Sequence, residues 1–121
     1  MAKKILIVDD QRELVEAMKM RFEDAGYDVF EAYDGKECLE KARKELPDLI
    51  IMDVAMPQMD GYEAVREIKG DDAIKKIPIF ILTGKDQMED IFKIEGIQEY
   101  ILKPFDYKVL LGMVKKLFGE Q

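Results

Sequence analysis

Five short apolar runs recur along the chain and alternate with longer amphipathic stretches. The run from Leu49 to Met52 contains no polar residue, so we expect both of its faces to be buried, as in the centre of a parallel sheet. We interpret all five runs as strands. The predicted strands are Ile5–Val8, Val29–Ala32, Leu49–Met52, Ile79–Leu82 and Tyr100–Leu102.

Each predicted strand is followed by apolar residues at helical spacing, which predicts five helices. The fourth of them, from Asp86 to Gly96, is short. The predicted inner faces are Leu14, Met18, Phe22 and Ala25 in the first helix; Cys38, Leu39, Ala42 and Leu46 in the second; Ala64, Val65 and Ile68 in the third; Ile91 and Ile94 in the fourth; and Val109, Leu110, Met113, Val114 and Leu117 in the last.

The residues at the ends of these helices support their boundaries. Asp10, Asp34 and Asp106 stand where a side chain can cap a helix start, and Glu13 would complete a capping box with Asp10. Gly26 is placed to end the first helix in the left-handed conformation.

Strands that alternate with helices are typical of a parallel α/β sheet, in which the crossovers are right-handed. No linker, repeat or low-complexity segment interrupts the pattern, so we expect residues 1–121 to form a single domain. We predict the flavodoxin-like (βα)5 fold, with five parallel strands in the order 2-1-3-4-5 and helices on both faces.

Composition excludes several classes of function. The chain has 19 basic and 26 acidic residues, a net charge of −7, which argues against a nucleic-acid binder and against an anionic membrane surface. No apolar run approaches the ~20 residues of a membrane-spanning helix. We therefore expect a cytoplasmic protein.

Histidine is absent, which removes histidine-based triads and most zinc sites. The single cysteine, Cys38, cannot form an internal disulfide, and a reducing compartment fits this. We interpret Cys38 as a small packed hydrophobic residue rather than a reactive thiol.

Polar side chains follow four of the predicted strands. In the predicted order the first and third strands are neighbours, so Asp9, Asp10 and Asp53 should converge at one edge of the sheet. Three carboxylates repel one another unless a cation balances them, and a hard divalent ion such as Mg²⁺ takes such oxygen ligands. Thr83 and Lys103 follow the fourth and fifth strands at the same edge.

This set of residues suits phosphoryl transfer. Asp53 is a candidate nucleophile that would form an aspartyl phosphate. Mg²⁺, Lys103 and the Thr83 hydroxyl would hold the transferring oxygens, because this chemistry depends mainly on positioning and charge neutralisation. No P-loop is present, so we expect the phosphoryl group to come from another molecule and not from bound ATP.

The chain resembles the receiver domain of two-component response regulators over its whole length. The motifs that carry the resemblance are Ile7-Val8-Asp9-Asp10, Asp53 followed by Met56-Pro57-Gln58-Met59-Asp60-Gly61, Thr83, and Lys103-Pro104-Phe105. Together, in this order and spacing, they are highly specific.

The resemblance implies a role for each site residue. It implies that Asp53 is the phosphoacceptor and that Asp10 and Asp53, with Asp9 through water and the Ala55 backbone carbonyl, hold Mg²⁺, with Mn²⁺ as a substitute. It implies that Thr83 and Tyr100 form a switch pair. It also implies that Lys103 contacts the phosphoryl group and that the Lys103–Pro104 bond is cis.

The resemblance also implies partners. A sensor histidine kinase or a histidine phosphotransfer protein would donate the phosphoryl group, and a downstream target protein would bind the face formed by the fourth helix, fifth strand and fifth helix. We expect a monomeric signalling switch that binds neither nucleic acid nor membrane. It would not be an enzyme beyond its own phosphorylation and dephosphorylation.

Three alternatives stay open at this point. A haloacid-dehalogenase-like phosphohydrolase also uses a nucleophilic aspartate, but its usual second acid two residues later is here Ala55. A flavodoxin-like FMN carrier would need a Ser/Thr-rich loop after the first strand, which is missing. A degenerate receiver would bind partners without being phosphorylated.

Overall fold

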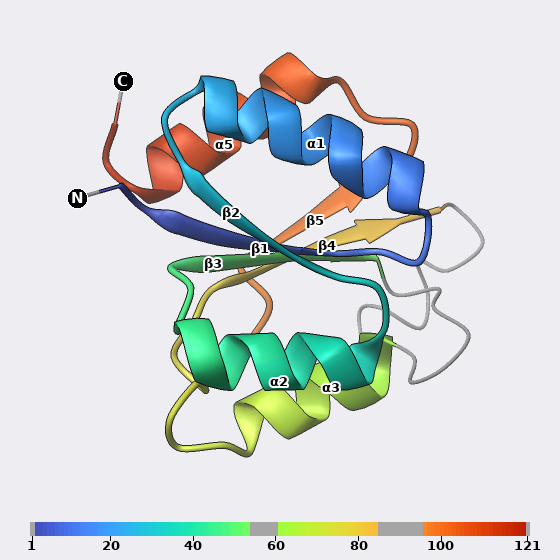
Figure 1. The fold of residues 1–121 in the computed structure, drawn as a ribbon, viewed down its shortest axis with the longest axis vertical. Helices are drawn as coiled ribbons and strands as arrows, with labels where there is room; N and C mark the ends of the chain where they lie inside the picture. Colours follow the sequence, from blue (N-terminus) through green and yellow to red (C-terminus); the bar gives the residue numbers. More distant parts are fainter. Residues whose placement is uncertain (1, 54–60, 85–95, 121) are drawn as a thin grey trace.

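The computed structural model describes residues 2–53, 61–84 and 96–120. Five strands and four helices lie in these ranges (Figure 1). The strands are β1 (Lys4–Val8), β2 (Asp28–Ala32), β3 (Leu49–Asp53), β4 (Ile79–Thr83) and β5 (Glu99–Leu102). The helices are α1 (Arg12–Asp24), α2 (Gly35–Glu45), α3 (Gly61–Lys69) and α5 (Tyr107–Leu117). The predicted fourth helix falls largely on residues 85–95, outside the described residues.

The strands form one parallel sheet in the order β2-β1-β3-β4-β5, which confirms the predicted fold class and strand order. The register aligns the carboxyl ends of neighbouring strands. Val8 pairs with Met52, Asp53 with Leu82, and Thr83 with Leu102. Residues that end these strands, or follow them directly, therefore gather at one edge of the sheet.

Helices cover both faces of the sheet, as predicted (Figure 1). The apolar side chains of α1 and α5 pack on one face of the central strands, and those of α2 and α3 pack on the other. All five residues of β3 and all five of β4 are buried. Burial on both faces explains why these two runs lack the polar alternation of a half-exposed strand.

Two of the predicted caps are confirmed. The Asp34 carboxylate accepts a hydrogen bond from the Glu37 amide at 2.8 Å, at the start of α2. The Asp106 carboxylate accepts one from the Lys108 amide at 2.8 Å, at the start of α5. Each bond satisfies an amide that has no partner within its own helix.

The capping box predicted for Asp10 and Glu13 is wrong. Helix α1 begins one residue later, and its cap position is Gln11, whose side chain makes no capping bond. The backbone is still extended at Gln11, with φ −89° and ψ 98°. The carboxylate of Asp9 binds the Gln11 amide instead, at 3.0 Å.

Two residues predicted to point inward are exposed. Leu46 has φ 49° and is 55% exposed, because the chain leaves α2 there through a left-handed turn before Pro47. Val109 is 61% exposed on the outer side of α5. In α1, Val15 is fully buried, while Leu14 is only partly buried. Helical spacing located these helices but not the exact centre of each buried face.

No helix in the described ranges is long and apolar enough to span a membrane.

Candidate phosphorylation site

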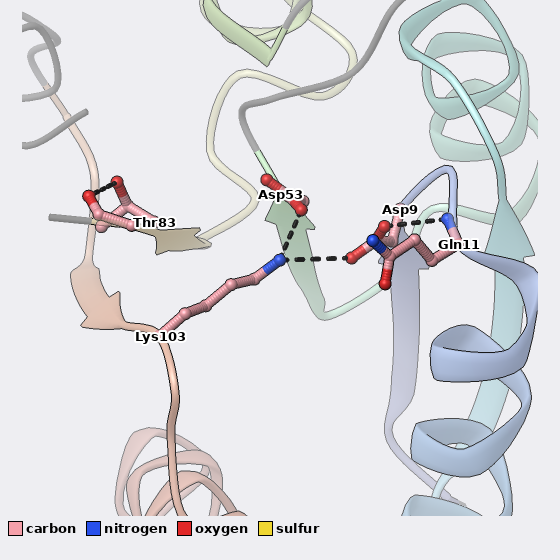
Figure 2. A network of polar contacts seen from close by, with 6 residues as sticks. Asp9, Gln11, Asp53, Thr83 and Lys103 are labelled. Atoms are coloured by element: carbon pink, nitrogen blue, oxygen red, sulfur yellow. Dashed lines mark hydrogen bonds and ion pairs between the residues drawn. The ribbon is translucent and has the colours of Figure 1, made fainter. Parts of the chain in front are cut away.

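Four side chains lie at the carboxyl edge of the sheet, and Lys103 contacts two of them, Asp9 and Asp53 (Figure 2). Asp9 follows β1 directly, and Asp53 is the last residue of the neighbouring strand β3. Thr83 ends β4, and Lys103 follows β5. Parallel pairing brings these residues from distant parts of the chain to one place, where open α/β sheets bind ligands.

Lys103 joins the two acidic strand ends. Its Nζ lies 2.6 Å from Oδ2 of Asp53 and 3.8 Å from Oδ2 of Asp9, and Figure 2 shows it reaching between the two carboxylates. The lysine side chain is 29% exposed, while Asp9 is 1% exposed. The ammonium therefore sits at the boundary between a buried acidic pair and solvent.

Asp9 is almost fully buried at this site. Its Oδ1 accepts the hydrogen bond from the Gln11 amide, but its buried Oδ2 accepts none from the residues that the structure describes. Burial raises the pKa of Asp9 from 3.8 to about 6, and the nearby Asp53 charge adds to the increase, while the Gln11 amide and Lys103 oppose it. The ionised carboxylate thus lacks sufficient stabilisation from the protein alone.

Thr83 is fully buried, and its hydroxyl donates to the Gly84 carbonyl at 3.1 Å. The Lys103 amide donates to the Thr83 carbonyl at 2.7 Å, which continues the pairing of β4 and β5 up to the site. The Lys103–Pro104 peptide bond is cis, as the resemblance implied.

Tyr100 lies on β5, three residues before Lys103, and is partly buried against the apolar cluster beneath α2 and α3. Burial raises the pKa of its hydroxyl. Tyr100 pairs with Ile81, two residues before Thr83. The two residues of the predicted switch pair therefore come from neighbouring strands.

The oxygen donors at this edge fit a hard divalent cation. Asp9 and Asp53 supply carboxylates, and the buried Oδ2 of Asp9 lacks a hydrogen-bond donor among the described residues. Asp10 comes next in the chain and is exposed. In the described part of the chain, three such side chains are not gathered closely enough to form a metal cluster. Ala55, the predicted carbonyl ligand, lies outside the described residues.

Sequence reasoning missed one member of the site, the backbone amide of Gln11. This amide holds one oxygen of Asp9 and leaves the other facing Lys103. An aspartate that binds the amide two residues later is a common local motif, but any residue except proline can supply that amide. The sequence therefore contained only a weak signal for it.

The interpretation of Cys38 is confirmed. Its side chain is fully buried in the cluster beneath α2, and burial raises the pKa of its thiol to about 12. A thiol of this kind stays protonated and unreactive near neutral pH.

Comparison with known proteins identifies the family. The family model described as the response regulator receiver domain matches residues 5–115. The chain is 40% identical over 119 residues to the alkaline phosphatase synthesis transcriptional regulatory protein PhoP of Bacillus subtilis. This match covers 97% of the chain and 49% of PhoP, so the chain spans about half the length of this curated relative.

Solved structures agree with this match. The signal receiver domain of a signal transduction histidine kinase from Syntrophus aciditrophicus is 37% identical with a TM-score of 0.88, covering 98% of this chain and 91% of that one. The chemotaxis response regulator CheY4 of Vibrio cholerae is 34% identical with a TM-score of 0.85, covering 96% of this chain and 98% of that one. The chain belongs to the receiver domain family of response regulators.

Proposed function

We propose that the chain is a signalling switch that accepts a phosphoryl group on Asp53. The observation that carries this proposal is the contact between Lys103 and Asp53 at 2.6 Å, beside the buried Asp9. This contact supports the proposal, because a carboxylate that can act as a nucleophile, a cation and a second acid lie together at one edge of the sheet. The family match supports the proposal and gives no support to the haloacid-dehalogenase-like alternative.

In the proposed reaction an oxygen of Asp53 attacks the phosphorus of the donor. A new P–O bond forms as the bond to the donor's leaving group breaks. Lys103 then moves from the carboxylate to the transferred phosphoryl oxygens, whose charge exceeds that of the carboxylate. Asp9, Asp10 and Asp53, with the carbonyl of Ala55, are the residues that would hold Mg²⁺. The bound ion would supply neutralisation of phosphoryl charge.

The proposed switch uses Thr83 and Tyr100. Before phosphorylation the Thr83 hydroxyl donates to the Gly84 carbonyl. A phosphoryl oxygen on Asp53 is a stronger acceptor, because charged acceptors form stronger hydrogen bonds. We propose that Thr83 turns to this oxygen and that Tyr100 moves inward behind it.

We propose that the donor is a sensor histidine kinase or a histidine phosphotransfer protein. The downstream target would bind the face that includes β5 and α5, together with the predicted fourth helix outside the described residues. Leu102 on β5 and Val109 on α5 are 40% and 61% exposed, so both side chains are accessible to a partner.

We propose that residues 1–121 act as one monomeric receiver domain in the cytoplasm and bind neither nucleic acid nor membrane. The net charge of −7 supports the absence of polyanionic partners. We propose no enzymatic activity beyond phosphorylation and dephosphorylation of the chain itself.

The test is incubation with acetyl phosphate and Mg²⁺, followed by intact-mass measurement. We expect one added phosphoryl group in the parent protein and none in Asp53→Asn. The variant Asp72→Asn is a matched control, because Asp72 is an exposed aspartate on the surface. Phosphorylation that persists in Asp53→Asn would show that the acceptor is another residue. An unmodified parent would favour the degenerate receiver.

A further inference from the structure

Lys69, the last residue of α3, lies in an unusual environment for a lysine. Its side chain is partly buried, and its aliphatic part lies against Gly96, which has φ +83°. A Cβ atom at position 96 would stand 3.1 Å from Cε and 3.4 Å from Nζ of Lys69. The absence of a side chain at Gly96 therefore lets the lysine pack closely on the backbone that leads into β5.

The amine of Lys69 has little compensation for its burial. Its Nζ donates to the Lys75 carbonyl at 3.4 Å, a long hydrogen bond. Among the described residues no carboxylate forms an ion pair with it. Other lysines differ: Nζ of Lys19 lies 2.7 Å from Glu31, and Nζ of Lys75 lies 2.9 Å from Asp72.

The difference in environment affects which form of the amine is present. Partial burial lowers the pKa of Lys69, because the charged form of the amine loses hydration. The hydrogen bond to Glu31 raises the pKa of Lys19. Only the neutral amine has the free electron pair that attacks an electrophile. At neutral pH a larger fraction of Lys69 than of Lys19 is therefore nucleophilic.

We propose that Lys69 is a modification site that accepts an acyl group from a small activated acyl donor of the thioester class. The neutral amine attacks the thioester carbonyl, a C–N amide bond forms and the C–S bond breaks. The thiolate leaves and takes up a proton, and the amine releases one, so that the products are an acyl-lysine and a free thiol. No oxidant, reductant or metal is required.

Acylation would change the contact with Gly96. The modified side chain carries no charge and has added atoms, while the lysine already occupies the space that a side chain at position 96 would take. The strand that follows, β5, carries Tyr100 and leads to Lys103. A change at Lys69 would thus act on the chain segment that enters this strand.

The test is acetylation of the unmodified protein by acetyl-coenzyme A without any added enzyme, followed by peptide mass spectrometry over time. We expect Lys69 to be acetylated faster than Lys19 and Lys75 at neutral pH. The advantage over Lys19 should shrink as the pH rises, because Lys19 then loses its proton too. Acetylation of Lys69 at a rate equal to or below that of Lys19 at neutral pH would overturn the proposal.

Two variants serve as controls in the acetylation experiment. Glu31→Gln removes the partner of Lys19 and should speed acetylation of Lys19 while leaving the rate at Lys69 unchanged. Lys69→Arg should abolish acetylation at position 69 without altering the rates at Lys19 and Lys75. If Glu31→Gln left the rate at Lys19 unchanged, the ion-pair argument would be wrong. A thioester donates no phosphoryl group, so the result does not depend on whether Asp53 is phosphorylated.

Discussion

Asp9 illustrates how a single buried charge links stability to the site. Its carboxylate is almost inaccessible and faces Asp53 as well as Lys103. A folded-state pKa of about 6, above the ordinary value of 3.8, means that the folded protein binds this proton more tightly than the unfolded chain does. Ionisation of Asp9 therefore costs folding free energy.

The free-energy cost of ionising Asp9 depends on pH. Below pH 3.8 Asp9 is protonated in both states, so it carries no penalty. The penalty grows as the pH rises from 3.8 to about 6 and is complete above that. At ~1.4 kcal/mol for each pH unit between the two pKa values, its upper limit is roughly 3 kcal/mol.

We predict that Asp9→Asn stabilises the metal-free protein near neutral pH by up to roughly 3 kcal/mol, because the amide carries no charge. The gain should fall toward zero as the pH approaches 3.8. Urea unfolding of both proteins over this pH range, in the presence of a chelator, measures it. A stability difference that does not change with pH would show that the charge of Asp9 is not its cause.

Leu46, directly after α2, has a strained backbone conformation. It occupies the left-handed region, φ 49° and ψ 62°, where a side chain costs about 1 kcal/mol. We predict that Leu46→Gly raises the free energy of unfolding by about 1 kcal/mol, since the exposed leucine loses little packing. Leu46→Ala keeps the strained backbone and should give no such gain in urea unfolding. Equal effects of the two variants would exclude relief of strain.

At the level of elements, two helices that begin in similar sequence contexts are held differently. At the start of α2 the Asp34 carboxylate accepts a hydrogen bond from the Glu37 amide, whereas Gln11, the cap residue of α1, makes no side-chain capping bond. We predict that Asp34→Ala lowers stability by about 1 kcal/mol and that Gln11→Ala leaves it nearly unchanged. Thermal unfolding of the two variants compares them directly. A loss of equal size in both would mean that the capping bond is not the cause.

The helix starts show where a local capping pattern predicts the cap correctly and where it does not. Asp34 and Asp106 cap as predicted because the residues after them enter a helix at once. Asp10 does not, because the preceding Asp9 binds the Gln11 amide and the chain stays extended for another residue. The contact of the buried Asp9 with the Gln11 amide cannot be read from the residues around Asp10.

For the molecule as a whole, the proposed metal site predicts a stability linked to Mg²⁺. At about ten times its dissociation constant, Mg²⁺ should add about 1.4 kcal/mol to the free energy of unfolding. The reason is that the ligands come together only in the folded chain. Asp53→Asn should abolish this increase, while Asp72→Asn, far out on the surface, should retain it. Urea unfolding at constant ionic strength with and without Mg²⁺ is the measurement. Indifference of the parent to Mg²⁺ would rule out the assembled site.

The residue pattern predicted three converging aspartates, of which Asp10 is exposed. It also predicted the strand positions, the parallel order and the place of Asp9, Asp53, Thr83 and Lys103 at the carboxyl edge. It could do so because buried strands must be apolar throughout and because parallel strands place their ends together. Asp9, Asp53, Thr83 and Lys103 each terminate or directly follow such a run.

The folded arrangement, by contrast, set how those side chains share charge and which residues lie at the surface. It placed Lys103 closer to Asp53 than to Asp9, and it left Oδ2 of Asp9 without a hydrogen bond from the described residues. It also left Lys69 partly buried on Gly96 without an acidic partner among those residues. Such features depend on distances between residues far apart in the chain, because Coulomb energies and desolvation vary over a few ångströms, whereas residue spacing reports only local geometry.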